Sequence, residues 1–294
     1  MQNDLNVLTI SGTVNVNHNI SGSVGVGGSG GNDDAILSGV WSKTSYTNSS
    51  ITKLSPAFPN GNITLQNVTE VGNHACEYSV GGKNWNLPEC LTVGMYAFRS
   101  NKTIISVNLP KCTEISLSAF EGCTNLATVN VPKLVTIGDT AFSGTGVQEF
   151  NLPECVTVGD SAFRNSTALQ SINLPKCESI AGSAFLSCNN LTAINLPCIK
   201  TIGNLAFNSD TRLATVTIGD ACTNINGNVF FGCTSLTSFT CYATTPPALG
   251  TGVFTNTPIQ TADGKIYVPS ASVDTYKAAS GWSTWSSKIE AIPS

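Results

Sequence analysis

The sequence predicts a mainly β solenoid, in which short coils of similar sequence stack on one another. Three observations predict this fold. The triplet Asn-Leu-Pro recurs at a nearly constant spacing, an Ala-Phe pair follows each triplet, and apolar residues alternate with polar ones around it. That alternation is the period of a strand with one buried face. A unit this short cannot bury its apolar side alone, so neighbouring units are expected to pack together.

The spacing of the triplet defines a repeat of about 22 residues. Copies begin at Asn86, Asn108, Asn130, Asn151, Asn173 and Asn195, and degenerate copies begin at Thr64 and Thr217. The Ala-Phe pair follows 11 to 12 positions later and supplies Phe98, Phe120, Phe142, Phe163, Phe185 and Phe207, with Phe230 and Phe254 after them. In the first copy Cys76, preceded by His74 and Ala75, takes the place of phenylalanine. We expect about eight repeats over residues 64–260.

Each repeat is expected to contain a strand, a turn, a second short strand or 3₁₀ turn, and a loop. Proline ends the first strand because it has no N–H to donate to a sheet. A second apolar position follows it and is occupied by Val93, Ile115, Ile137, Val158, Ile180, Ile202 and Ile225. Stacked strands lie about 4.8 Å apart. The phenylalanines should therefore form one continuous aromatic spine, which would be the core.

The repeat unit resembles a known family. Residues 115–132 read ISLSAFEGCTNLATVNVP, which resembles the unit x-x-I-x-x-x-A-F-x-x-C-x-x-L-x-x-I-x-L-P of BspA-type leucine-rich repeats. Residues 241–247, 266–269 and 273–277 look like the C-terminal cap of that family. The resemblance implies a leucine-rich-repeat solenoid with a C-terminal α/β cap over residues 261–294. Residues 32–63 would then form the N-terminal cap.

The predicted C-terminal cap contains a short helix. Ser270 is suited to N-cap a helix from Ala271 to Ala279, and Gly281 would end it. Four apolar side chains are then expected to cover the last coil: Trp282, Trp285, Ile289 and Ile292.

The N-terminal 31 residues differ from the repeats. ISGTVNV at residues 10–16 recurs as ISGSVGV at residues 20–26, and a glycine-rich linker follows. Such strands bury too little surface to fold alone, so we expect them to pair with other copies of the chain, as a homotrimer. The apolar residues of this predicted attachment segment are Ile10, Val14, Val16, Ile20, Val24 and Val26. The segment resembles the N-terminal attachment segments of bacteriophage and prophage structural proteins.

Composition argues against several classes of function. Only 11% of the residues are charged and the net charge is −4, so we expect no nucleic-acid partner. No apolar run is long enough to span a bilayer, so membrane insertion is not expected. With two histidines and no C-x-x-C pair, the sequence predicts no metal, no cofactor and no catalytic residues. Gly25–Gly30 fits G-x-G-x-x-G, but no helix is predicted after it, which favours a linker.

Cysteines and asparagines recur in columns along the repeats. Cys90 with Cys112, and Cys155 with Cys177, would be close enough to form disulfides, but the odd total of 11 favours free buried thiols. The six asparagines that begin the triplets should point away from the spine. They would form either a ladder of hydrogen-bonded amides or a ligand-binding face suited to sugar hydroxyls and polar loops.

Two functions remain open. We expect a non-enzymatic virion fibre or receptor-binding protein of a bacteriophage or prophage. It would attach to other virion proteins through its N-terminus and bind a host cell-surface glycan or protein. The absence of a leader at the start of the sequence favours this virion location. The alternative is a secreted or surface-anchored bacterial leucine-rich-repeat adhesin that binds host glycoproteins, the role that the family resemblance implies.

Overall fold

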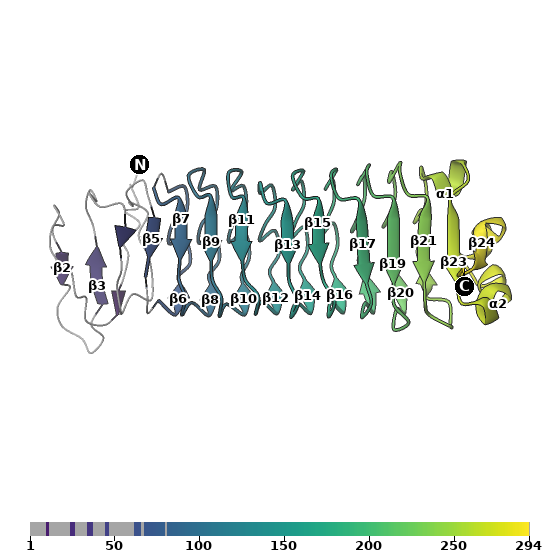
Figure 1. The fold of residues 1–294 in the computed structure, drawn as a ribbon, viewed down its shortest axis with the longest axis horizontal. Coiled ribbons are helices and arrows are strands. Elements are labelled where there is room, and N and C mark those ends of the chain that lie inside the picture. Colours follow the sequence, from purple (N-terminus) through teal and green to yellow (C-terminus); the bar gives the residue numbers. More distant parts are fainter. Residues whose placement is uncertain are drawn as a thin grey trace.

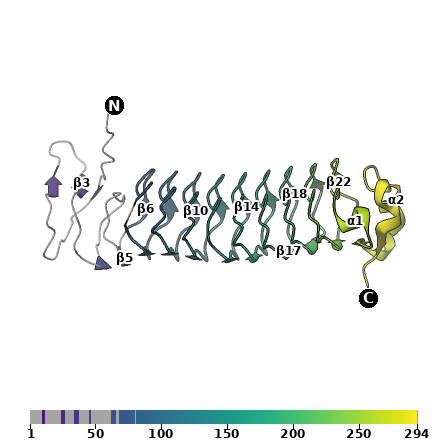
Figure 2. The ribbon, with the colours of Figure 1, turned by 90° about the horizontal axis from the view of Figure 1, so that it is seen from above.

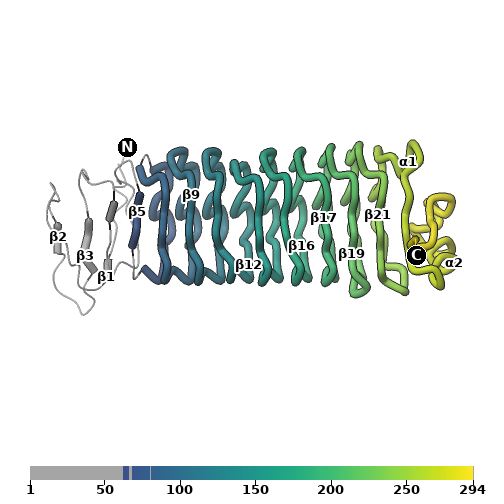
Figure 3. The backbone as a smooth tube through the Cα atoms, viewed as in Figure 1, coloured from purple at the N-terminus to yellow at the C-terminus, as the bar shows by residue number. Residues whose placement is uncertain are grey.

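The computed structural model describes residues 62–65, 68–79 and 81–293, together with the backbone of four short strands at 10–11, 24–26, 34–37 and 45–46. Figure 1 shows an elongated solenoid whose coils succeed one another along the long axis. Figure 3 follows the backbone through the same coils toward the C-terminus. The predicted solenoid of coils of about 22 residues is confirmed.

Each coil contributes two strands to two parallel sheets. The longer strands are β5 (Asn62–Thr64), β7 (Asn84–Asn86), β9 (Ser106–Asn108), β11 (Thr128–Asn130), β13 (Glu149–Asn151), β15 (Ser171–Asn173), β17 (Ala193–Leu196), β19 (Thr215–Ile218), β21 (Ser238–Cys241) and β23 (Lys265–Val268). The shorter strands are β6 (Glu70–Val71), β8 (Thr92–Val93), β10 (Glu114–Ile115), β12 (Thr136–Ile137), β14 (Thr157–Val158), β16 (Ser179–Ile180), β18 (Thr201–Ile202), β20 (Asn224–Ile225) and β22 (Ala248–Leu249). Figure 2 shows the two sets along different sides of the solenoid. A third segment, which carries Ala-Phe, closes each coil.

The phenylalanines form the predicted spine. All eight rings from Phe98 to Phe254 are fully buried. Successive rings stack with centroids 5.0 to 5.9 Å apart and with planes inclined by at most 18°. Trp85 packs edge-on against the first ring and Trp285 against the last. Burying each ring contributes about 2 to 3 kcal/mol, so this single file of rings contributes substantially to stability alongside the buried Leu, Ile and Val side chains of the same core.

The coil that begins at Asn130 is one residue shorter than the coils on either side of it, and the sheet of longer strands breaks there. β11 ends one section of that sheet and β13 begins the next, whereas β12 and β14 still pair. In the short coil the backbone of Gly146 lies so close to the preceding coil that a Cβ added there would be 2.4 Å from the carbonyl oxygen of Thr124. The sheet also breaks between β15 and β17.

The C-terminal cap agrees with the prediction in its architecture but not in its helix boundaries. α1 (Pro258–Thr261) was not predicted. Ser270 does not cap a helix but begins a 3₁₀ turn, η1 (Ser270–Ser272), and α2 (Val273–Ala278) follows it. η2 (Ser283–Lys288) leads into β24 (Ile289–Ala291), which pairs with β23. Trp282 is fully buried, its indole N–H donates to the Pro247 carbonyl (2.7 Å), and its ring contacts that of Tyr276. Ile289 is buried and Ile292 is partly exposed.

The N-terminal strands pair within the chain. β1 (Ile10–Ser11) and β2 (Val24–Val26) both run antiparallel to β3 (Asp34–Leu37), and β4 (Ser45–Tyr46) runs parallel to β5. β3 thus supplies the partner that the sequence suggested in another copy of the chain. Val14, Val16 and Ile20 lie outside the described residues. Nothing in this pairing tests the homotrimer, which stays a prediction.

Candidate functional site

The asparagine column lies on the outer face of the longer strands. Within each section of this sheet, in-register parallel pairing sets an asparagine beside its equivalent on the next coil. The Nδ2 of Asn108 donates to the Oδ1 of Asn86 (2.6 Å), and that of Asn130 donates to the Oδ1 of Asn108 (2.5 Å). Asn173 makes the same contact with Asn151 (2.8 Å). The predicted ladder of amides is therefore present in two sections, on either side of the break between β11 and β13.

The ladder leaves hydrogen-bonding capacity toward solvent. An amide within it uses one N–H and one oxygen lone pair along the stack, so a second N–H and a second lone pair stay available. Asn130, Asn151, Asn173 and Asn195 are exposed, and Asn195 lies on β17, beyond the second break. The ladder explains the asparagine column structurally. A ligand-binding role for it stays a prediction.

Exposed ion pairs join neighbouring coils beside the ladder. Lysine Nζ atoms lie 2.6 to 2.8 Å from glutamate oxygens in three pairs, Glu89–Lys111, Glu154–Lys176 and Glu178–Lys200. In the first two pairs each charged residue directly follows the proline of its coil. Exposed pairs of this kind contribute about 0 to 1 kcal/mol each. They help to set the register, and because their charges cancel they leave this wall nearly neutral.

A second group of surface residues lies on the third segment of the first complete coils. We name His74, Glu77, Tyr78, Tyr96, Arg99 and Glu121 the tyrosine–arginine cluster. The rings of His74 and Tyr96 stack with centroids 4.9 Å apart and an angle of 25°. The guanidinium carbon of Arg99 lies 5.2 Å from the ring centre of Tyr96 and 6.0 Å from that of Tyr78.

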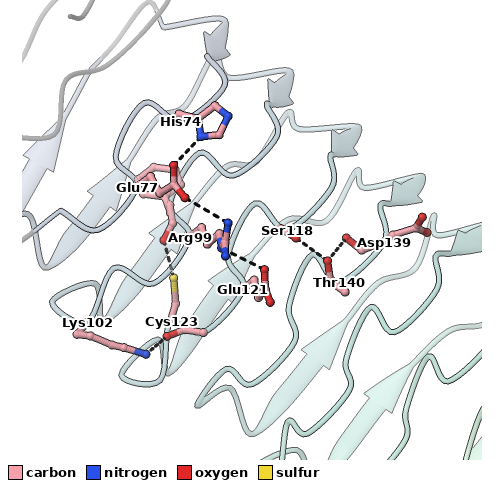
Figure 4. Close-up of polar contacts among 11 residues, drawn as sticks. His74, Glu77, Arg99, Lys102, Ser118, Glu121, Cys123, Asp139 and Thr140 are labelled. Carbon is pink, nitrogen blue, oxygen red and sulfur yellow. Dashed lines mark hydrogen bonds and ion pairs between the residues drawn. The ribbon is translucent and has the colours of Figure 1, made fainter. Parts of the chain in front are cut away.

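Charged partners hold the arginine of the cluster. Figure 4 shows His74, Glu77, Arg99 and Glu121 in a row across three coils. His74 Nδ1 lies 2.5 Å from a Glu77 carboxylate oxygen, and Arg99 reaches Glu77 at 3.5 Å and Glu121 at 3.4 Å. In the sequence His74 stood out only as part of an irregular copy, and the other members of the cluster were not predicted. The signal available was the aromatic residue at 96, where the next coils have Ser118 and Thr140.

The family model for the BspA type leucine rich repeat region, in six copies, matches residues 45–168 and 156–274. The chain belongs to the BspA-type leucine-rich repeat family. No curated protein matches it. A leucine-rich repeat protein from Bacteroides ovatus has a similar structure, with a TM-score of 0.50 and 23% identity over 69% of this chain and 59% of that one. A leucine rich cell surface protein from Faecalibacterium prausnitzii has a TM-score of 0.52 and 18% identity over 80% and 71% of the two chains.

These comparisons confirm the family resemblance and the solenoid fold. At such identities the solved structures show a shared fold and nothing finer. This chain spans 59% of the length of the Bacteroides protein. The prediction of a phage fibre, and with it the virion location, receives no support from the comparisons.

The thiols of this BspA-type protein belong to its interior. The ten cysteines from Cys90 to Cys241 are free thiols, and Cys198 is the exposed one among them. The Sγ–H groups of Cys90 and Cys112 donate to the backbone carbonyls of Thr92 and Glu114, each at 3.3 Å. Burial raises the pKa of both thiols to about 12. They are protonated at neutral pH and pack as small apolar groups, as the sequence predicted.

Acidic, thiol and imidazole groups do not converge in the described part of the chain. Among those residues no group of three or more His, Cys, Asp or Glu side chains is placed to hold a metal ion. In the same part of the chain, no helix combines the length and apolar character needed to cross a membrane.

Proposed function

We propose that this chain is a bacterial adhesin, secreted or displayed at the cell surface, that binds host extracellular glycoproteins without catalysing a reaction. Its membership of the BspA-type repeat family carries the proposal. The fold suits such a role, because the aromatic spine occupies the interior and the side chains on the outer walls are available to a partner. The structural relative from Faecalibacterium is a cell surface protein by name.

The outer walls offer polar groups rather than reactive ones. The exposed amides of the longer strands can donate to and accept from hydroxyl groups, as a glycoprotein surface requires. Burial raises the pKa of the Cys155 and Cys177 thiols to about 12, so they stay protonated, and their position keeps them from a ligand. Binding without catalysis is therefore the activity that the described residues support.

A binding experiment tests the proposal. The full chain would be passed over immobilised extracellular matrix glycoproteins and, as a control, over serum albumin, with binding followed by biolayer interferometry. We expect saturable binding to at least one glycoprotein and none to albumin. If the chain binds none of the glycoproteins in the panel, the adhesin proposal is refuted.

The contribution of the asparagine column needs a separate variant. Asn130→Ala, Asn151→Ala and Asn173→Ala together remove three exposed amides, whereas Lys111→Gln, Lys176→Gln and Lys200→Gln change a neighbouring set of exposed side chains. If the amide face binds, the first triple variant weakens binding at least tenfold and the second does not. If the triple asparagine variant binds as well as the triple lysine variant, the asparagine column does not bind the ligand.

The predicted homotrimer is proposed separately and rests on the N-terminal duplication. Light scattering of the full chain should give three times the chain mass of 30.6 kDa. A chain lacking residues 1–31 should give the mass of a single shortened chain. A monomeric full chain would refute it. No observation favours a virion fibre over the adhesin.

A further inference from the structure

We propose that the tyrosine–arginine cluster binds uncharged glycans through their hexopyranose rings. The inference deepens the proposed adhesin function, on which it rests, by naming a site and a ligand class. It is carried by three features of the cluster: aromatic side chains that break the pattern of the repeat, the ring and guanidinium geometry, and the local charge.

The aromatic residues of the cluster stand where most other coils have small polar residues. His74 and Tyr96 have φ values of 55° and 58°, and the same left-handed position is taken in later coils by Ser118, Thr140, Ser161, Ser183, Leu205 and Asn228. Tyr78 has a φ of 52°, and its position is taken in later coils by Ser100, Gly122, Gly144, Asn165, Ser187, Ser209 and Gly232. Bulky residues rarely adopt this backbone conformation.

Packing of the core does not account for these side chains. Tyr78 is 61% exposed, the side chain of His74 is 51% exposed, and neighbouring Met95 is also exposed. A serine in the same position would keep the coil intact, as it does in the next coils. Large aromatic rings that are both conformationally unfavourable and open to water are typical of a binding surface.

The geometry of the cluster suits the two kinds of surface on a sugar ring. A hexopyranose has faces of C–H groups, which pack on aromatic rings, and a rim of hydroxyls, which form hydrogen bonds. The stacked rings of His74 and Tyr96 offer a platform for such a face, and the exposed ring of Tyr78 lies within 6.0 Å of the Arg99 guanidinium carbon.

Hydrogen-bonding groups border this platform. Arg99 has five N–H donors; its Nε lies near Glu121 and one terminal nitrogen lies near Glu77. With respect to the described residues, its other N–H groups can donate to sugar hydroxyls. Because the two glutamates hold the guanidinium, it is positioned before a ligand arrives, which reduces the entropy lost on binding.

The charge of the cluster selects among glycans. Two carboxylates, those of Glu77 and Glu121, flank the single guanidinium of Arg99. A sialylated or sulfated glycan would place another anion beside these carboxylates. Like charges at short range oppose binding, so uncharged glycans are the favoured ligands.

Titration calorimetry with defined oligosaccharides tests the site. The probes are the neutral cellohexaose, chitohexaose, maltohexaose and lacto-N-neotetraose, together with sialylated lacto-N-neotetraose. We expect the full chain to bind at least one neutral probe, and to bind it more tightly than the sialylated one. The double variant Tyr78→Ser, Tyr96→Ser should weaken that binding at least tenfold while its melting temperature falls by no more than a few degrees.

Two further variants make the result specific. Tyr242→Ser removes an exposed tyrosine outside the cluster and should leave binding unchanged. Arg99→Lys keeps the charge but removes the planar donor fork, and should also weaken binding.

Three results would overturn the proposal: no neutral probe binds, the sialylated probe binds best, or the double variant binds as well as the parent chain. Adhesion that persists on enzymatically deglycosylated glycoprotein and in the double variant would overturn the glycan site, yet leave the adhesin proposal standing with a polypeptide ligand.

Discussion

Replacing Asp210 with cysteine should stabilise the solenoid at neutral pH. Asp210 is fully buried in a column that holds Cys123, Ser166, Cys188 and Cys233 in other coils. There the Sγ–H or Oγ–H group donates to a phenylalanine carbonyl of an adjacent coil at 2.8 to 3.0 Å. Asp210 instead accepts from the Cys188 N–H through Oδ1 (2.7 Å), and its Oδ2 has no hydrogen-bond partner.

The size of the effect follows from that unpaired oxygen. A buried polar atom without a partner costs about 1 to 3 kcal/mol, and cysteine is close to aspartate in volume, so no large cavity forms. The Cys188 N–H keeps a second acceptor, the Phe185 carbonyl at 3.0 Å. We therefore expect Asp210→Cys to raise the free energy of unfolding by about 1 to 3 kcal/mol at pH 7 to 8.

The effect should depend on pH. Burial raises the pKa of Asp210 well above its ordinary value of 3.8. The folded chain then holds this proton more tightly than the unfolded chain, so Asp210 disfavours folding increasingly as the pH rises above about 4. The advantage of Asp210→Cys should be greatest at pH 7 to 8 and should shrink toward pH 4.

Urea unfolding of both chains in reducing buffer, at intervals from pH 4.5 to 8, measures this difference. Hydrogen exchange of the coils around Cys188 and Cys233 checks it locally, because a solenoid can unfold in sections. Ser166→Cys, in the same column, removes no carboxylate and should show no comparable pH dependence. A less stable Asp210→Cys chain at pH 7.5, or a difference that is constant across the pH range, would refute the reasoning.

Three other substitutions or modifications test the fold. Phe120→Ala should lower the free energy of unfolding by about 3 to 5 kcal/mol, because its ring is buried between two stacked neighbours; a change below 1 kcal/mol in urea unfolding would contradict the spine. Gly146→Ala should lower the melting temperature, because the new Cβ would lie 2.4 Å from the Thr124 carbonyl oxygen. Gly227→Ala should not lower it, because the nearest atom to the new Cβ is 3.4 Å away. Equal melting temperatures of the two variants would contradict the close approach of the coils at Gly146. Reaction with a thiol reagent at pH 8 should modify one cysteine rapidly, Cys198, and the rest only after unfolding; several rapid equivalents would contradict the buried thiols.

The sequence predicted what every coil repeats. The phenylalanine positions, the second apolar position and the asparagine column follow from periodicity alone, because equivalent residues occupy equivalent places in a stack. The boundaries of the C-terminal helices did not follow. α1 has four residues, too few to show a helical period, and a 3₁₀ turn at Ser270–Ser272 displaced the expected cap.

The departures from the repeat were visible in the sequence, but their consequences were not. The spacing of 21 residues between Asn130 and Asn151 shows that a residue is missing. At this coil the shorter strands stay paired and the longer strands separate. This difference depends on how closely neighbouring backbones approach, which the sequence does not show. The tyrosine–arginine cluster likewise depends on the left-handed backbone and on the stacking of coils, which bring residues 22 positions apart together.

Asp210 and Tyr96 both break the pattern of their columns, and their positions separate the two effects. Asp210 has no surface accessible to a ligand, so its replacement should change stability and leave glycan binding unaltered. Tyr96 and Tyr78 lie on the outer wall, so their replacement by serine should change binding and leave stability nearly unaltered. A chain carrying Asp210→Cys with both tyrosine substitutions should show the sum of the two changes, because the sites share no contact. Loss of oligosaccharide binding in Asp210→Cys alone would show that the cluster depends on the strength of the whole stack, and the site could then not be assigned to its exposed side chains.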